Sequence, residues 1–304
     1  MDDFTSALRR GLSGTVKSPV LIVAGLLSGL VMAVTLIQYG PLNSVVNSTQ
    51  PDLIETILVL GVSTVLPMFA MPFILGGALG CAVAQSTGGK ASWGLFFETG
   101  RKHYLNMLMA GIAAWLVYYF LSLLMIVLII MGSASPLFMF LLVLIGGAAL
   151  FFGLMFIEFY DISIVAGKVD FIRSFGESIG FVRKHVAIVI PFFIIVVALK
   201  TLVQLPLLTA YLLKGISIIA ANLTYYDNGT VNSTLLNETV NSTTAALQTI
   251  SFSAPSLLAI MLLQGLVQSI VFAFLISCKA EFYQWAKNIK KITDFDYDFS
   301  ADRQ

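Results

Sequence analysis

Six long apolar segments are the sequence feature that most restricts what this chain can fold into. They cover residues 19–39, 53–84, 104–131, 137–165, 186–213 and 255–278. The hydrocarbon core of a bilayer is about 30 Å thick, so an α-helix crosses it with about 20 apolar residues. The segments are continuously apolar and do not alternate as barrel strands do, which favours helices. We therefore expect an all-α integral membrane protein with six transmembrane helices.

The composition agrees with a membrane protein and excludes several other classes. Of the 304 residues, 58% are hydrophobic and only 11% are charged, whereas about 25% of the residues of a soluble domain are charged. A soluble globular domain and a disordered chain are therefore excluded. The net charge of +1 gives no overall field that would attract nucleic acid. Membrane lipids are the expected partners, and we expect no nucleic acid.

The basic residues predict how the chain is oriented in the membrane. Of the 17 Lys and Arg residues, three precede the first span, three lie between spans two and three, four lie between spans four and five, and five follow the last span. The opposite side has only Lys214, and Lys200 lies inside the fifth span. Cytoplasmic loops carry an excess of Lys and Arg. We expect a cell-membrane protein with both termini in the cytoplasm.

Six Asn-x-Ser/Thr sequons fall in segments that this topology places outside. They are Asn47, Asn222, Asn228, Asn232, Asn237 and Asn241. Five of them crowd the region around the predicted outer loop, residues 214–253. Such density favours a glycan-covered loop on an archaeal or eukaryotic surface. The alternative is that Asn, Ser and Thr are simply common in exposed loops.

Short amphipathic stretches precede the first, third and fifth spans and predict interfacial helices. They cover residues 4–17, 93–102 and 171–184, and each ends in a basic elbow at the membrane boundary. One interpretation is a threefold repeat within a single membrane domain, residues 1–304. The units would then be 1–88, 89–167 and 168–304. The other interpretation is that any chain re-entering a bilayer needs such a lead-in, and both stay open.

Polar side chains inside the spans are candidates for a functional site, because burying them in lipid costs free energy. The candidates are Lys200 and Gln204 in the fifth span, and Gln264 and Gln268 in the sixth. Each pair is one helical turn apart, and the two pairs fall at similar depth. Either glutamines and carbonyls hold the ammonium of Lys200 as part of the structure, or the group forms a ligand or ion site.

A second set of charged residues lies near the cytoplasmic end of the fourth span. Glu158 and Asp161 are in that span, and Lys168 and Arg183 lie close to the same boundary in sequence. We expect an interfacial ionic cluster with a structural role. A substrate site is the alternative.

Motifs of known catalytic sites are missing from the sequence. There is no GxxxxGK[ST], HExxH or GxSxG, and the only histidines are His103 and His185. We therefore expect no catalytic residues, no metal and no cofactor. The only two cysteines, Cys81 and Cys278, are expected to be buried thiols and not a disulfide.

Several segments together resemble a known membrane domain. They are FIEFYDISIV at 156–165, FIRSF at 171–175, FVRK at 181–184 and FETGRKHY at 97–104. This pattern of a span end, a short helix and a basic elbow is similar to the membrane domain associated with glycerophosphoryl diester phosphodiesterases. It is also similar to uncharacterised archaeal six-span membrane proteins of that group. The resemblance implies an all-helical membrane fold, but no phosphodiesterase activity, because nothing here resembles the soluble catalytic domain.

The sequence is compatible with two functions. The first is a non-enzymatic accessory or scaffold module of the cell envelope, with a membrane-protein partner or a second copy of the chain bound to it. The second is a small transporter or channel with a polar site around Lys200. A transporter would have a cavity connecting Lys200 to one side of the membrane. A scaffold would have a filled core and an exposed apolar flank.

Overall fold

The computed structural model of the protein describes residues 2–39, 61–132, 135–224 and 253–301. Within these ranges the chain is all-helical, and it has no strand there. In chain order the helices are α1 (Asp2–Lys17), α2 (Pro19–Val34), the 3₁₀-helix η1 (Thr35–Tyr39), the π-helix η2 (Gly61–Val65), α5 (Leu66–Ser86), α6 (Trp93–Gly132), α7 (Pro136–Ile157), α8 (Tyr160–Gly167), α9 (Phe171–Lys184), α10 (Val186–Thr224) and α12 (Ala254–Ala301). The predicted all-α fold is therefore confirmed.

Six of the described helical segments are long and apolar enough to cross a membrane. Their bounds are Pro19–Ile37, Gly61–Ser86, Trp93–Gly132, Leu137–Gly167, Val186–Ser217 and Pro255–Lys287. Each contains one of the apolar sequence segments or most of it. The last one extends nine residues beyond Cys278, where the apolar run in the sequence ends.

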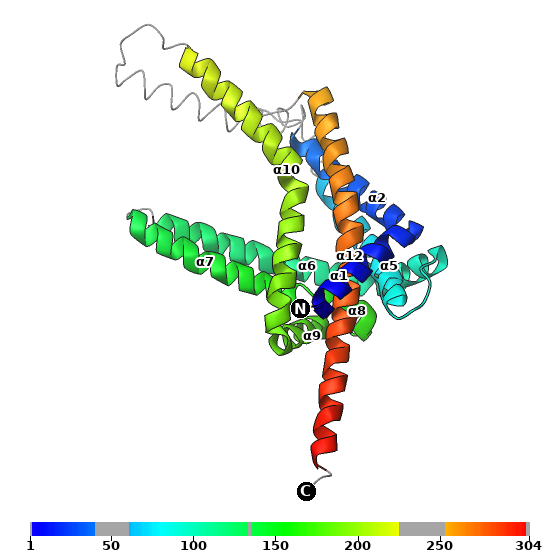
Figure 1. The fold of residues 1–304 in the computed structure, drawn as a ribbon. Helices are drawn as coiled ribbons and strands as arrows, with labels where there is room; N and C mark the ends of the chain where they lie inside the picture. Colours follow the sequence, from blue (N-terminus) through cyan, green and yellow to red (C-terminus); the bar gives the residue numbers. More distant parts are fainter. Residues whose placement is uncertain (1, 40–60, 133–134, 225–252, 302–304) are drawn as a thin grey trace. The chain divides into compact units, whose positions relative to one another are not determined.

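The chain divides into two compact units. Unit 1 consists of residues 1–25, 68–198 and 272–304, and unit 2 consists of residues 26–67 and 199–271. Helices α2, α5, α10 and α12 contribute residues to both. Within unit 1, α6 and α7 lie side by side as an antiparallel hairpin (Figure 1).

The lead-ins to the first, third and fifth apolar segments are all helical, but they differ in how they end. The helix before the first span, α1, stops at Lys17, and α9 stops at Lys184. Each is separated from the next helix by a single residue, Ser18 or His185. Residues 93–102, in contrast, continue without a break into the rest of α6. Only the first and third lead-ins are therefore separate helices.

Glycines allow close approach between helices within each unit. In unit 1 a Cβ atom added at Gly77 of α5 would lie 2.7 Å from the Phe96 carbonyl oxygen of α6. In unit 2 a Cβ atom added at Gly29 of α2 would overlap the Gly265 carbonyl oxygen of α12. A larger side chain at either position would force the backbones apart, as expected for small residues at helix interfaces in membranes.

Candidate functional site

The break between α7 and α8 places two carboxylates at the candidate site in unit 1. Glu158 caps the C-terminus of α7 and Phe159 precedes α8. The Ser178 hydroxyl of α9 donates to the Phe156 carbonyl at 2.7 Å and accepts from the Phe159 amide at 3.1 Å. Backbone groups at the break are thereby satisfied although they lie outside a helical ladder. These hydrogen bonds stabilise the break, which fixes the backbone from which Glu158 and Asp161 extend.

Lys279 of α12 is the cation that contacts both carboxylates. Its Nζ atom lies 2.9 Å from Glu158 Oε1 and 2.9 and 3.0 Å from the two carboxylate oxygens of Asp161. It also donates to the Glu158 backbone carbonyl at 2.6 Å. An ammonium has three donors, and these acceptors are sufficient to satisfy all three. We refer to Lys279, Glu158 and Asp161 as the ionic cluster.

The ionic cluster is buried, which determines its energetics. Lys279 is only 7% exposed and Asp161 only 5%. Asp161 Oδ1 also accepts from the Ile162 amide at 2.7 Å, so the carboxylate is held by α8 as well as by Lys279. Moving three charges out of water costs several kcal/mol each, which mutual attraction and hydrogen bonds offset only while every partner is present. The cluster is thus strongly interdependent.

Aromatic rings pack beside the ionic cluster. Phe192 and Phe282 stack in parallel with centroids 4.3 Å apart, and Phe159 stacks on Phe282 at 5.9 Å. The Lys279 Nζ atom lies 5.8 Å from the centroid of the Phe159 ring. Nearby, the hydroxyls of Ser163 and Tyr283 are 3.4 Å apart. Burial of this kind strengthens the electrostatic attraction between Lys279 and its partners.

The ionic cluster joins α8 to α12 inside unit 1. Its ammonium is engaged by acceptors on two sides, and no group of three or more His, Cys, Asp or Glu residues that could hold a metal occurs among the described residues. Cys81 and Cys278 are buried free thiols, as predicted.

The predicted interfacial cluster differs in its cation from the one observed. Glu158 and Asp161 do lie together, but their ion pairs are made with Lys279. Lys168 is exposed and caps the C-terminus of α8 with a left-handed backbone, φ 54°. Arg183 is exposed in the last turn of α9. The prediction of Lys168 and Arg183 as the cations was therefore wrong. It relied on proximity in the sequence, whereas Lys279 lies 118 residues after Asp161.

The polar residues predicted inside the fifth and sixth spans lie in unit 2. Gln264 is buried, and its Nε2 atom donates to Gln204 Oε1 at 3.4 Å. Gln268 Nε2 donates to the Ser28 hydroxyl of α2 at 3.4 Å. Gln264 Oε1 is buried without a hydrogen-bond partner, and Lys200 is exposed on the protein surface. The structure thus brings Gln204 and Gln264 together as predicted from their similar depth.

Comparison with known proteins gives a family without an assigned activity. Residues 3–286 match the family described as a domain of unknown function (DUF7847). The chain belongs to this family. No curated protein and no solved structure matches it. The DUF7847 match includes the ionic cluster and all but one residue of the last candidate span, so both are parts of the family domain.

The predicted sequons fall mostly outside the part of this DUF7847 domain that the structure describes. Asn222 lies in the last turn of α10. The others, Asn47, Asn228, Asn232, Asn237 and Asn241, lie outside the described residues. Their modification stays a prediction from the sequence.

Proposed function

We propose that this DUF7847 protein is a six-span protein of the cell membrane, with both termini in the cytoplasm, that serves as a non-enzymatic accessory or scaffold module of the cell envelope. The observation that carries the proposal is the surface of α6 and α7. None of the residues in the most apolar window of α6 is buried in the protein. Large aromatic and aliphatic side chains of both helices, among them Phe120 at 66% exposed, face outward. Exposing an apolar surface of this extent to water is unfavourable, so lipid or a protein partner covers it.

The ionic cluster supports the same proposal from inside unit 1. Its buried charges are used in holding α8 and α12 together, and its aromatic surroundings are close-packed. A scaffold needs a rigid interior of this kind and an outer surface free to bind. Helices α1 and α9, which end in basic residues next to the first and fifth spans, are then the interfacial helices at the cytoplasmic boundary.

The resemblance to the membrane domain associated with glycerophosphoryl diester phosphodiesterases supports this proposal and indicates which class of membrane protein the chain belongs to. Under it, the chain is a relative of that membrane domain and lacks the hydrolase. Purified protein should then leave glycerophosphodiesters unhydrolysed, and its role should lie in contacts made within the membrane.

Site-specific photo-crosslinking in cells tests the scaffold proposal. A photoreactive residue at Phe120, exposed on α6, should give a discrete protein adduct in addition to lipid adducts. The matched control is Met155 on α7, which is fully buried and should give neither. Lipid adducts alone at every exposed position of the hairpin would contradict a scaffold.

A small transporter or channel around Lys200 is the second candidate. It is favoured by the Gln264 Oε1 atom, which is buried without a hydrogen-bond partner beside Gln204. A buried polar atom of this kind costs free energy and calls for an explanation, such as a water or a transported ligand. Uptake of a solute into sealed liposomes that depends on Lys200 would favour this function over the scaffold.

A further inference from the structure

A groove of about 630 Å³ lies between α9 and α12 in unit 1. Its volume is in the range of small-ligand sites, about 300–1,000 Å³. Three cations line it, Arg173 and Lys184 from α9 and Lys287 from α12, together with one carboxylate, Glu177. The lining therefore has an excess of two positive charges with its histidine counted as neutral, and outside the lining Asp170 Oδ2 lies 4.0 Å from Arg173 Nε. That excess favours an anionic ligand with more than one charged oxygen.

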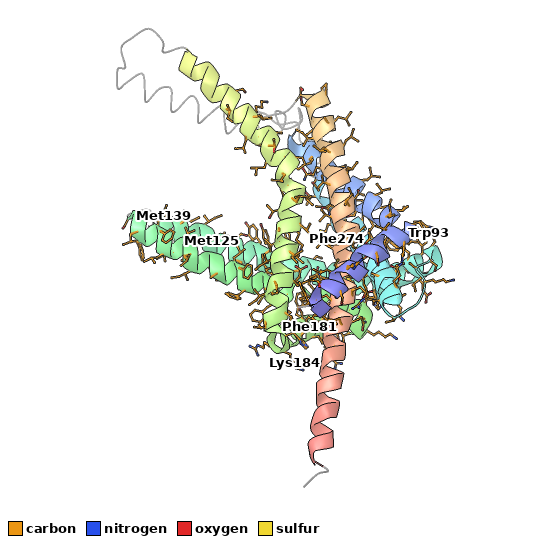
Figure 2. The ribbon with its side chains drawn as sticks, in the orientation of Figure 1. Trp93, Met125, Met139, Phe181, Lys184 and Phe274 are labelled. Atoms are coloured by element: carbon orange, nitrogen blue, oxygen red, sulfur yellow. The ribbon has the colours of Figure 1, made fainter. Side chains whose placement is uncertain are left out.

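The cations come from two helices and line the same groove. Arg173, Glu177 and Lys184 recur at helical spacing along one side of α9. The Lys287 ammonium lies 4.5 Å from the centroid of the Tyr283 ring, which positions it at the α12 wall. Figure 2 shows Phe181 and Lys184 near one another at the end of α9. The opposite side of α9, with Ser174 and Ser178, is buried in unit 1, so the groove side is free.

Two glycines keep the groove open. A Cβ atom added at Gly176 or at Gly180 would meet no atom within 4 Å. Packing against the described residues therefore does not require glycine at either position. Glycine in the middle of a helix is less stable than alanine, so α9 is less stable than it could be while it leaves this space unfilled. This is independent of the charges and indicates that the space itself is used.

The groove lies at the ends of two candidate spans. Lys184 is separated by one residue from Val186, where the fifth candidate span begins, and Lys287 is the last residue of the sixth. Under the proposed orientation, both ends are at the cytoplasmic surface of the membrane, at the height of lipid headgroups. We propose that the groove binds the phosphate of an anionic lipid headgroup from the cytoplasmic leaflet. This rests on the membrane placement proposed above.

The chemistry of the groove fits that ligand. Arginine binds phosphate oxygens through two parallel hydrogen bonds, and lysine adds point charges. Tyr283 and Phe181 also line the groove but are only 1% and 6% exposed, so the cations supply most of the contacts with the headgroup. Arg173 and Lys287 are the cations through which the groove would hold the phosphate.

Binding is tested with the full chain purified in a neutral detergent. Short-chain phosphatidic acid, phosphatidylglycerol and phosphatidylcholine are titrated separately, with glycerol phosphate as the headgroup without acyl chains. The two anionic lipids should bind, as seen by native mass spectrometry and by a raised unfolding temperature, and phosphatidylcholine should not. Glycerol phosphate binding as tightly as the anionic lipids would overturn a lipid site in favour of a soluble phosphate ester.

Two charge variants and a matched control identify the groove. Arg173→Gln and Lys287→Gln should each weaken anionic lipid binding about fivefold, as expected for one cation at a membrane surface. Arg101→Gln removes an exposed cation of α6 that does not line the groove, and it should leave binding unchanged. An equal loss in Arg101→Gln would reduce the effect to general attraction and overturn the proposal.

A steric variant keeps every cation and fills the space. Gly180→Leu should fold, because its Cβ meets nothing, and should weaken anionic lipid binding by more than tenfold. Unchanged binding would overturn the proposal. A changed oligomeric state with unchanged lipid binding would identify the glycine side of α9 as a contact for another helix. Because the assay uses detergent, its failure leaves the membrane topology untouched, which side-specific labelling tests separately.

Discussion

Lys279 and Asp161 are 118 residues apart in the sequence, yet the Lys279 ammonium lies within 3.0 Å of both carboxylate oxygens of Asp161. The contact joins α12 to the short helix α8 inside unit 1. At the end of α7, Glu158 Oε1 lies 2.9 Å from the same ammonium. One cation near the end of the last candidate span therefore holds the middle of the chain in place.

Replacing Lys279 should destabilise the protein strongly. Lys279→Met leaves Glu158 and Asp161 buried next to each other without a cation, so we expect the free energy of unfolding to fall by about 3–5 kcal/mol. Chemical or thermal unfolding of the purified protein in detergent measures this. Adding Glu158→Gln and Asp161→Asn to the variant should recover part of the loss, because the uncompensated charges disappear.

The control is an ion pair of the same unit at the protein surface. Arg10 pairs with Glu281 at 3.3 Å, and its side chain is 55% exposed. Exposed pairs contribute about 0–1 kcal/mol, so Arg10→Met should have a small effect. If Lys279→Met costs no more than Arg10→Met, the ionic cluster does not stabilise the fold.

Lys279 also shows what could not be read from the sequence. The apolar run ends at Cys278, so the sequence pattern predicts that Lys279 belongs to the cytoplasmic tail with the other basic residues that follow the last span. The sequence does indicate that the buried part of the helix extends further, since Phe282 and Tyr283 continue its apolar side past this lysine. Which carboxylates it would meet depends on contacts between distant segments, and local pattern does not encode these.

The helices themselves were predictable because their signal is local. A run of about 20 apolar residues can satisfy its backbone in lipid only as a helix. Helix boundaries were harder to predict, as residues 93–102 show. They have the composition of a separate lead-in but join α6 directly, because no residue there interrupts the helix as Ser18 does before α2.

Gly29 should be intolerant of a larger side chain. A Cβ atom there would overlap the Gly265 carbonyl and the Ser269 hydroxyl, so Gly29→Leu should cost about 1–3 kcal/mol or more through overpacking. Gly111→Ala on α6 is the control, since its Cβ would meet nothing. Loss of a helix glycine there should stabilise the protein by up to about 1 kcal/mol. Unfolding in detergent compares the two, and equal effects would refute the close approach.

The proposed orientation is tested by labelling single cysteines from each side of the membrane. With Cys81 and Cys278 replaced by alanine, Ser242→Cys should react with an impermeant reagent added outside intact cells. Phe295→Cys should react only after the cells are opened, because the excess of Lys and Arg keeps its side in the cytoplasm. Labelling of both from the same side would rule out the six-span topology.

Lys200→Met discriminates between the two proposed functions. A charged side chain in the middle of a span costs free energy, between about 3 and more than 10 kcal/mol. If Lys200 is only structural, its replacement should leave the unfolding temperature unchanged or raise it, because the hydrogen bond between Gln204 and Gln264 stays intact. We expect this outcome. The control is Lys214→Met, on the same helix but closer to its outer end. Screening small anions tests the transporter. It predicts a solute that raises the unfolding temperature of the wild type and of Lys214→Met but leaves that of Lys200→Met unchanged. Such a solute would overturn the structural role of Lys200 and favour transport.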